Sequence, residues 1–252
     1  MKKTIWVDFT NTPHVHFLIP IIILLRKKFK FLITARDFSE TVPLLEHYGV
    51  NAKVIGKHRG KSRIAKLFGI LQRIFILYFY LPKFDIALAV AGLNATQVSW
   101  LRRRPVITFK DNEVSDGFIT FPSYYFCPNI IDKKKIIRTG IKEDRIIQYK
   151  GLKENIYLAY YKPNPDFLSK IPFKDYVVVR PENLKADYVP KNIESLVPDL
   201  LSELVKKNFN VVFIPRYEFE RSYAPVSNKI FIPEKVLNGL DLCFNSSAVI
   251  TG

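Results

Sequence analysis

Cysteine is scarce in this sequence, and the two present, Cys127 and Cys243, lie far apart. They form no CxxC pair, which excludes a zinc ribbon and argues against a disulfide-rich secreted scaffold. We expect both to be buried thiols in a reducing compartment, and we expect no metal site. The sequence therefore favours a cytoplasmic protein.

Hydrophobic runs long enough to cross a bilayer are also lacking. The apolar stretch 17–25 is too short, it follows Asp8 and two histidines, and no small-residue cleavage site comes after it. The stretch 67–81 is more hydrophobic but is interrupted by Gln72 and Arg73. We interpret it as an interfacial or core helix and not as a membrane span.

Several familiar catalytic motifs are absent. No HExxH, GxGxxG or Walker spacing occurs, and no Ser, His and Asp follow a hydrolase order. These absences argue against a zinc protease, a classical NAD enzyme and a serine hydrolase, and we expect no cofactor. No RGG run, zinc finger or RNP-like motif accompanies the basic residues, so nucleic acid is an unlikely partner.

Negative charge is scarce as well: 39 lysines and arginines stand against 23 acidic residues, for a net charge of +16. Such a charge favours an anionic partner, either nucleic acid, anionic lipid or a phosphorylated small molecule, although a lysine-rich solvated surface is the alternative. In the segment 61–81, apolar residues with Lys61, Arg63, Lys66 and Arg73 predict weak peripheral binding to an anionic membrane, at the inner membrane face. The competing interpretation is a helix whose apolar face is buried.

What the sequence does contain is a regular alternation of apolar strands and helices. In the first half we expect strands at 4–8, 30–34, 52–55, 85–89, 106–109 and 146–149, a bent strand at 118–126, and helices at 14–27, 39–48, 64–81 and 94–102. This alternation predicts βαβ units around a parallel sheet that is covered on both faces.

After a Lys-Pro-Asn-Pro connector at 162–165, the alternation begins again. Here we expect strands at 176–179, 210–214, 230–232 and 248–251 and helices at 193–207 and 236–244. The sequence therefore predicts an α/β fold of two Rossmann-like parallel-sheet domains, an N-terminal one at 1–155 and a partial C-terminal one at 160–252.

We expect the second domain to be truncated. A parallel strand normally feeds a loop and a covering helix, but the last predicted strand ends at Thr251-Gly252. Apolar side chains such as Val249 or Val211 would then be exposed, and self-association or a missing companion segment would follow.

Candidate site residues are sought in the loops after the strands, because open α/β sheets bind ligands outside the carboxyl ends of their strands. The first such loop holds Asp8, Asn11, His14 and His16. An imidazole at a helix start can act as a base or bind an anion, so we interpret Asp8, His14 and His16 as candidate catalytic residues and Asn11 as substrate-binding. The alternative is that Asp8 simply braces the turn.

Further candidates follow the next strands. Lys57 and His58 lie between glycines and suit a phosphate clamp, or equally a solvated loop. Asp111 and Glu113 follow the fifth strand, where paired carboxylates can do acid/base work, although Asp111 can instead cap a helix. Asn94 begins the helix after the fourth strand and is a candidate substrate-binding residue.

In the second half, Arg180, Glu182 and Asn183 follow one strand and Arg216 follows the next. Two arginines at neighbouring strand ends suit a bidentate clamp on one anionic ligand. Surface salt bridges are the alternative interpretation of these arginines.

These motifs together resemble the family catalogued as domain of unknown function 354, over essentially the whole chain. The resemblance is carried by Asp8-Phe-Thr-Asn11-Thr-Pro-His14-Val-His16-Phe, Thr34-Ala-Arg36-Asp-Phe-Ser-Glu-Thr41, Val54-Ile-Gly56-Lys-His58, Gly151-Leu-Lys-Glu154 and Val179-Arg180-Pro-Glu182. It implies a fold like that of the glycosyltransferase-B superfamily.

More distantly, Arg180-Pro-Glu182-Asn183 is similar to the His-Arg-x-Glu-Asn segment of UDP-N-acetylglucosamine 2-epimerases. The opening loop lies where transferases of the MurG kind carry a glycine-rich loop and a histidine, and Gly252 stands where a Gly-Gly-Thr loop of the relatives begins. The resemblance implies a UDP-sugar in a cleft between the halves, with Arg180 and Arg216 on its pyrophosphate and first-loop residues addressing the sugar or acceptor.

Three functions are open at this point. The leading hypothesis is a nucleotide-sugar enzyme, either a transferase or an epimerase. The second is a non-catalytic or inactive, truncated binding module. The third is a nucleic-acid or anionic-membrane binder, which rests on the charge alone.

Overall fold

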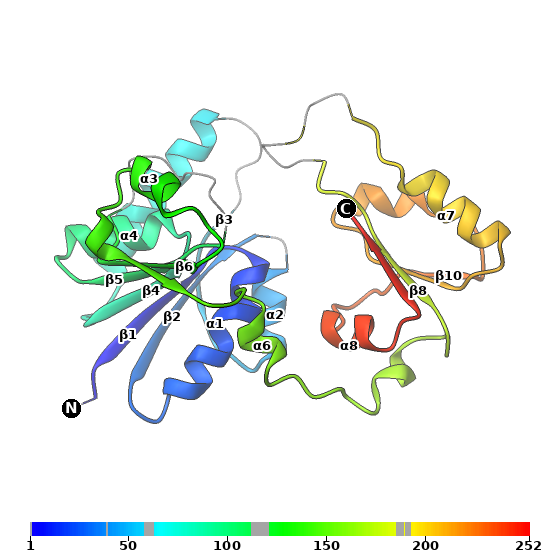
Figure 1. Cartoon of the computed structure of the whole chain (residues 1–252), viewed down its shortest axis with the longest axis horizontal. Helices are drawn as coiled ribbons and strands as arrows, with labels where there is room; N and C mark the ends of the chain where they lie inside the picture. Colours follow the sequence, from blue (N-terminus) through cyan, green and yellow to red (C-terminus); the bar gives the residue numbers. More distant parts are fainter. Residues whose placement is uncertain (1, 39, 58–62, 112–120, 185–188, 190–192) are drawn as a thin grey trace. The chain divides into compact units, whose positions relative to one another are not determined.

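The structure is a computed structural model of the chain, and it describes residues 2–38, 40–57, 63–111, 121–184, 189 and 193–252. The sequence predictions for His58, Lys61 and Glu113, and for part of the bent strand at 118–126, lie outside the described residues. The chain divides into two compact units, drawn in Figure 1.

Unit 1, Met1–Tyr160, is built on a seven-stranded parallel sheet with the strand order β3-β2-β1-β4-β5-β6-β7. Its elements are β1 Thr4–Phe9, α1 Thr12–Leu25, β2 Lys30–Asp37, α2 Thr41–His47, β3 Lys53–Lys57, α3 Arg63–Tyr80, β4 Ile86–Val90, α4 Leu93–Leu101, β5 Val106–Phe109, β6 Tyr124–Pro128, α5 Lys133–Arg138, η1 Glu143–Arg145, β7 Ile146–Tyr149 and α6 Asn155–Leu158. The α/β class predicted from the sequence is confirmed.

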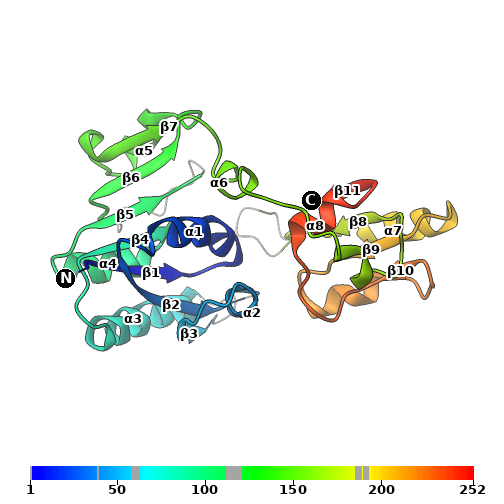
Figure 2. The same cartoon turned by 90° about the horizontal axis from the view of Figure 1, so that it is seen from below.

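The helices of unit 1 cover both faces of this sheet. From β1 the chain advances to β2 and β3 at one edge and then returns to β4 and β5, so right-handed crossovers place α1 and α2 on one face and α3 and α4 on the other. Helix α1 packs against α2, and α3 packs against α4 (Figure 2). The fully buried Trp6 packs with Leu77 and Phe84 on the α3 face. Because side chains alternate along a strand, Asp8 faces the same side as Trp6.

Unit 2, Tyr161–Gly252, holds a four-stranded parallel sheet with the order β10-β9-β8-β11. Its elements are η2 Phe167–Lys170, β8 Val177–Arg180, α7 Val197–Lys206, β9 Val211–Phe213, η3 Glu218–Tyr223, β10 Ile230–Phe231, α8 Gly239–Phe244 and β11 Ala248–Thr251. Val177 and Val179 pack in the cluster that includes Leu201 of α7, whereas Val178 packs with Leu242 of α8. The two helices therefore cover opposite faces of β8.

Two helices begin later than the sequence periodicity predicts, and in each a polar side chain accepts a hydrogen bond from an amide of the first turn. The Ser195 hydroxyl accepts a hydrogen bond from the Val197 amide at 3.2 Å, and α7 starts there and not at residue 193. The Asn238 side chain accepts from the amides of Leu240 and Asp241, which starts α8 at Gly239 and not at residue 236.

Two expectations about burial need correction. Val211 is fully buried, because β9 packs under α7, although Val249 of β11 is 44% exposed as expected. Cys127 and Cys243 are both free, but only Cys127 is buried, since Cys243 lies on the exposed side of α8. Among the described residues, no helix has both the length and the apolar character needed to span a bilayer.

Candidate functional site

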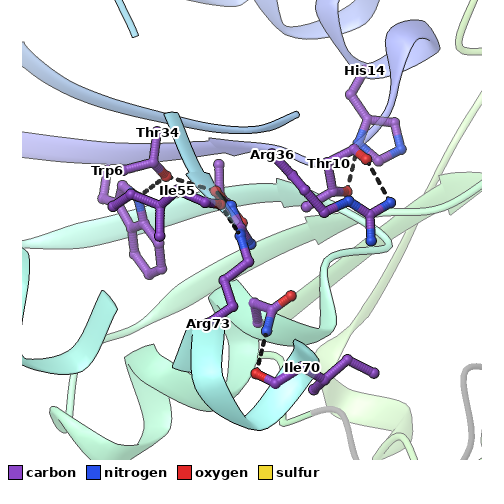
Figure 3. A network of polar contacts seen from close by, with 10 residues as sticks. Trp6, Thr10, His14, Thr34, Arg36, Ile55, Ile70 and Arg73 are labelled. Atoms are coloured by element: carbon purple, nitrogen blue, oxygen red, sulfur yellow. Dashed lines mark hydrogen bonds and ion pairs between the residues drawn. The ribbon is translucent and has the colours of Figure 1, made fainter. Parts of the chain in front are cut away.

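The first polar cluster lies in unit 1 at the carboxyl end of β1, where Asp8 is buried beneath α3. Arg73 of α3 donates two hydrogen bonds to its carboxylate, from Nη1 to Oδ2 at 2.8 Å and from Nη2 to Oδ1 at 2.6 Å. Figure 3 shows Arg73 pointing from α3 toward the strands, where its Nε donates to the Ile55 carbonyl at 2.7 Å. The side chains of Arg73 and Asp8 are 3% and 0% exposed, so this is a buried and fully hydrogen-bonded ion pair.

Three neighbours complete this network. The Thr34 hydroxyl donates to Asp8 Oδ1 at 2.6 Å and accepts from Trp6 Nε1 at 2.9 Å. Gly56, at φ +79°, leaves room for Arg73, since a Cβ there would lie 3.0 Å from the Arg73 Cδ. Both carboxylate oxygens of Asp8 are thus occupied within unit 1. Asp8 braces α3 against the sheet, and the catalytic role expected for it from the sequence stays a prediction.

Beside this network, the loop between β1 and α1 presents His14. Thr10 Oγ1 lies 3.2 Å from His14 Nδ1, and Arg36 Nη2 donates to the Thr10 carbonyl at 2.9 Å (Figure 3). Asn11 is the N-cap of α1, where its Oδ1 accepts from the Thr12 amide at 2.9 Å. The loop is therefore held in place by local hydrogen bonds, and it fixes the His14 ring at the start of the helix.

His14 is held in its neutral form. Burial lowers its pKa to about 4, and the positive charge of Lys153 contributes to the same effect, while Asp8 and Asp111 act in the opposite direction. Lys153 forms an ion pair with Asp111 and lies 3.8 Å from Glu154. A histidine with this pKa is neutral at pH 7, so its ring can accept a hydrogen bond from a ligand.

A cavity of about 620 Å³ opens in unit 1 between the ends of β2 and β3 and helix α3, and its lining includes Arg36, Lys57, Arg73 and Asn94. Arg36 Nε is buried without a hydrogen-bond partner among the described residues. Asn94 Nδ2 donates to the Ile70 carbonyl at 3.2 Å, and Lys57 is exposed at the end of β3. The cavity has the size of a small-molecule site, and its basic and amide groups suit anionic or hydroxyl-bearing ligands.

His16 lies away from this cavity. A side chain two positions further along an α-helix is rotated by about 200°, so His14 and His16 project from opposite sides of α1. His16 Nδ1 lies 3.1 Å from the Tyr48 hydroxyl, and its ring is 5.8 Å from the ring of Tyr157. Burial, with a smaller effect of His47, lowers the pKa of His16. The structure thus separates the two histidines that the sequence placed in one loop.

In unit 2, Arg180 is the last residue of β8, paired in register with Thr251 of β11. Its Nε is buried and has no hydrogen-bond partner among the described residues. A buried donor that the protein leaves unpaired costs stability unless a ligand satisfies it.

Arg216, which follows β9, has different surroundings. Its Nε donates to the Pro181 carbonyl at 2.7 Å and its Nη2 donates to the Gly252 carbonyl at 3.1 Å. Arg216 therefore ties together the segments that follow β8 and β11. That both arginines clamp one anionic ligand stays a prediction, and in the structure Arg216 already donates to backbone carbonyls.

Glu182 is fixed close to these segments. It accepts hydrogen bonds from the Ser195 hydroxyl at 2.7 Å and the Leu196 amide at 3.1 Å. Burial alone would raise its pKa, but these hydrogen bonds and the charge of Arg216 hold the pKa below its ordinary value. A Cβ added to Gly252 would lie 2.5 Å from the Glu182 Cγ, so only glycine allows this close approach. Glu182 is therefore an ionised side chain in a tightly packed strand end.

Asn183 lies next to this group. Its Oδ1 accepts a hydrogen bond from the Tyr217 hydroxyl at 3.1 Å. Unit 2 thus brings Arg180, Glu182, Asn183, Arg216 and Gly252 to the carboxyl ends of its strands, as the sequence predicted.

Three residues of the site in unit 1 were not selected from the sequence: Arg36, Arg73 and Lys153. Arg73 had a signal, because it stands between Ile70 and Leu77 at the spacing of the core-facing stripe, where a cation requires a buried partner. Arg36 and Lys153 stand inside motifs that carry the family resemblance, without any local pattern to mark them. Among the described residues, no group of three or more His, Cys, Asp or Glu side chains is placed to hold a metal ion.

Comparison with known proteins places this chain in a family. The family described as "Protein of unknown function (DUF354)" matches residues 3–252. The chain belongs to the DUF354 family. An uncharacterized protein of Methanocaldococcus jannaschii is 28% identical to it over 267 residues, which cover 98% of this chain and 75% of the relative.

Solved structures of two nucleotide-sugar epimerases are similar to this DUF354 chain. The UDP-N-acetylglucosamine 2-epimerase of Rickettsia bellii matches with a TM-score of 0.71 and 14% identity, over 100% of this chain and 74% of that one. The epimerase of Methanocaldococcus jannaschii, in complex with UDP-GlcNAc and UDP, matches with a TM-score of 0.66 and 18% identity, over 98% and 78%. At these identities the likeness shows the fold, and the predicted pair of Rossmann-like parallel sheets is confirmed.

Proposed function

We propose that this DUF354 chain binds a nucleotide-sugar of the UDP-sugar class at the carboxyl ends of the unit 2 strands. The observation that carries the proposal is Arg180, whose buried Nε lacks a partner at the carboxyl end of β8. Ligands of open α/β sheets bind at this end of the strands, and an arginine donor suits the oxygens of a diphosphate. The structurally similar Methanocaldococcus epimerase is in complex with UDP-GlcNAc and UDP, which supports the ligand class.

Unit 1 offers a polar site of its own, which suits a sugar or an acceptor. Its cavity offers Arg36, Lys57 and Asn94, whose donors suit hydroxyl and carbonyl oxygens. The neutral ring of His14, beside the Lys153–Asp111 ion pair, is the group best suited to move a proton. In the proposed site His14 is thus the acid or base, and Asn11 positions it by capping α1.

Binding without turnover is the second candidate function. Asp8 and Asp111, the two candidate carboxylates that the structure describes, are both ion-paired, with Arg73 and Lys153 respectively. Carboxylates that are held by cations of unit 1 itself are less available to contact a ligand. Incubation with UDP-GlcNAc followed by chromatography separates the two candidates, since only an enzyme changes the ligand.

Thermal unfolding of the whole chain with added ligand tests the proposal. Uridine, UMP, UDP and UDP-GlcNAc are compared, each at about 100 times the dissociation constant expected for a specific ligand. A ligand that binds only the native state raises stability by about 2.7 kcal/mol at that concentration, or about 5–10 °C in Tm. We expect this shift with UDP and UDP-GlcNAc and not with uridine. Equal Tm values with all four compounds would contradict the proposal.

A further inference from the structure

The outward face of α3 is apolar along its length. Leu67, Leu71, Phe75 and Phe79 recur every four residues and are 58%, 56%, 65% and 68% exposed. We call these four residues the α3 outer stripe. Leu77, on the other side of α3, is fully buried in the core of unit 1. The stripe is therefore not the core-facing side of the helix, and side chains of this size at this spacing form a continuous exposed apolar surface.

A basic pocket lies at the end of the stripe. A cavity of about 320 Å³ is lined by Tyr78, Lys83, Phe84, Leu101, Arg102, Arg103 and Arg104, and this set contains four cations and no carboxylate. Arg102 is fixed, because its Nη1 donates to the Leu81 carbonyl at 2.8 Å and its guanidinium lies 5.2 Å from the ring of Phe84. Lys83, Arg103 and Arg104 are exposed. The pocket concentrates positive charge at one place on unit 1.

Ring contacts connect the pocket with the stripe. Tyr78, which lines the pocket, contacts Phe79 with ring centroids 4.9 Å apart, and Phe79 contacts Phe75 at 4.8 Å. Helices α3 and α4 pack side by side (Figure 2), and at the end of α4 Trp100 is 56% exposed. Apolar, aromatic and cationic groups thus form one continuous surface.

We propose that this surface docks the protein on an anionic lipid bilayer, with the α3 outer stripe in the interfacial region and the basic pocket on lipid phosphates. Interfacial helices combine an apolar face with basic residues and aromatic side chains in this way. The net charge of +16 complements an anionic membrane. Nucleic acid is disfavoured, because leucines and phenylalanines of the stripe offer no contact to phosphates.

The cations that act here differ from those expected from the sequence. Arg73 is excluded, because it is buried on Asp8. Lys61 lies outside the described residues, and the side chains of Arg63 and Lys66 are not described either. The proposal therefore rests on the basic pocket near the end of α3.

Sedimentation of the whole chain with vesicles tests the proposal. Vesicles of pure phosphatidylcholine are compared with vesicles that contain phosphatidylglycerol, in 0.1 M salt. We expect binding to the anionic vesicles only. Lys83→Gln/Arg104→Gln should weaken it about 30-fold, since each basic residue near a membrane surface contributes about a factor of five. Phe75→Gln/Phe79→Gln should weaken it at least tenfold.

Matched controls use exposed residues of the same kind elsewhere in unit 1. Lys134→Gln/Arg138→Gln on α5 removes the same charge, and Ile130→Gln replaces an apolar side chain that is 81% exposed. Both should bind vesicles like the unchanged chain. Far-UV circular dichroism of every variant shows that the fold is retained.

Five outcomes would overturn the proposal. Equal binding to both vesicle types would show that the surface does not recognise anionic lipid. Control variants that lose as much affinity would show that binding does not depend on the stripe and the basic pocket. A concentration-dependent dimer that Phe75→Gln/Phe79→Gln abolishes would assign the stripe to a second copy, and an oligonucleotide that binds without vesicles and depends on Lys83 and Arg104 would assign the pocket to nucleic acid. Tight binding of free glycerol phosphate at the pocket would assign it to a soluble phosphate.

Discussion

Arg73 in unit 1 and Arg180 in unit 2 both lie near the carboxyl ends of parallel strands, but their surroundings differ. Each nitrogen of the Arg73 guanidinium donates a hydrogen bond within unit 1, to Asp8 or to the Ile55 carbonyl. Arg180 has a buried Nε without a partner among the described residues. The comparison shows that a strand-end arginine is evidence for a ligand only when the protein itself leaves donors unused.

The difference also assigns the two arginines to different properties. Removing Arg73 leaves the Asp8 carboxylate buried and unpaired, so the cost falls on folding. Arg180 Nε donates to no acceptor among the described residues, so its removal leaves no acceptor unpaired. The loss should therefore appear in the affinity for the ligand. The predictions below separate stability from binding on this basis.

The largest expected effect is on the folding of unit 1. We expect Arg73→Leu to lower the free energy of unfolding by about 3–5 kcal/mol, because it leaves a buried charge without its partner. Urea denaturation followed by tryptophan fluorescence measures it, since Trp6 hydrogen-bonds to Thr34 within the same network.

A double variant provides the control for this loss. Asp8→Leu/Arg73→Leu removes both charges and should recover most of the stability, since apolar pairs of similar volume replace buried ion pairs well. Lys206→Gln, in the exposed pair with Glu203, should leave the midpoint unchanged. If Arg73→Leu behaved like Lys206→Gln, the network would not hold α3 to the sheet.

The next effect concerns pH and His14. The pKa of His14 is about 4 in the folded chain, below its ordinary value of 6.5, so the unfolded chain binds the proton more tightly. The contribution of neutral His14 to the free energy of unfolding is therefore complete above pH 6.5. It is lost as the pH falls toward 4, and the loss is on the order of 3 kcal/mol. Urea midpoints measured from pH 7.5 to 4 should show the decline, and His14→Asn should flatten it. His47→Asn, which changes an exposed histidine, should leave the decline unchanged. An equal flattening in that variant would refute the assignment of the decline to His14.

A smaller effect is expected at Thr34. Thr34→Val keeps the volume but leaves the Trp6 Nε1 donor unpaired and removes one donor to Asp8. We expect a loss of about 1–3 kcal/mol in the free energy of unfolding. Thr34→Ser retains the hydroxyl and should lose less than Thr34→Val. The reverse order would show that the methyl packing matters and the hydrogen bonds do not.

Local patterns in the sequence were sufficient for most of the fold. The period of apolar residues located the strands, and polar residues after them marked Asn11, His14 and Arg180 at strand ends. Both signals depend on neighbours along the chain, which a sequence displays directly. The late starts of α7 and α8 escaped prediction, because they depend on which hydroxyl or amide caps the first turn.

The pairing of charges could not be predicted in the same way. Asp8 and Arg73 are 65 positions apart, and Asp111 and Lys153 are 42 apart. Periodicity identifies which residues face the core but not which distant residue each one meets. The ion pair of Asp8 escaped prediction for this reason, since its partner is brought close only in the folded chain.

The most direct test of the proposed function is the affinity for UDP when Arg180 is changed. Isothermal titration of the whole chain is compared with Arg180→Gln and with Arg138→Gln, which removes an exposed arginine of α5. We predict that Arg180→Gln raises the Kd about 30-fold, the equivalent of about 2 kcal/mol for a charge-assisted hydrogen bond, with an unchanged urea midpoint. Arg138→Gln should bind like the unchanged chain. Undiminished UDP binding by Arg180→Gln, or no UDP binding by the unchanged chain, would contradict the account.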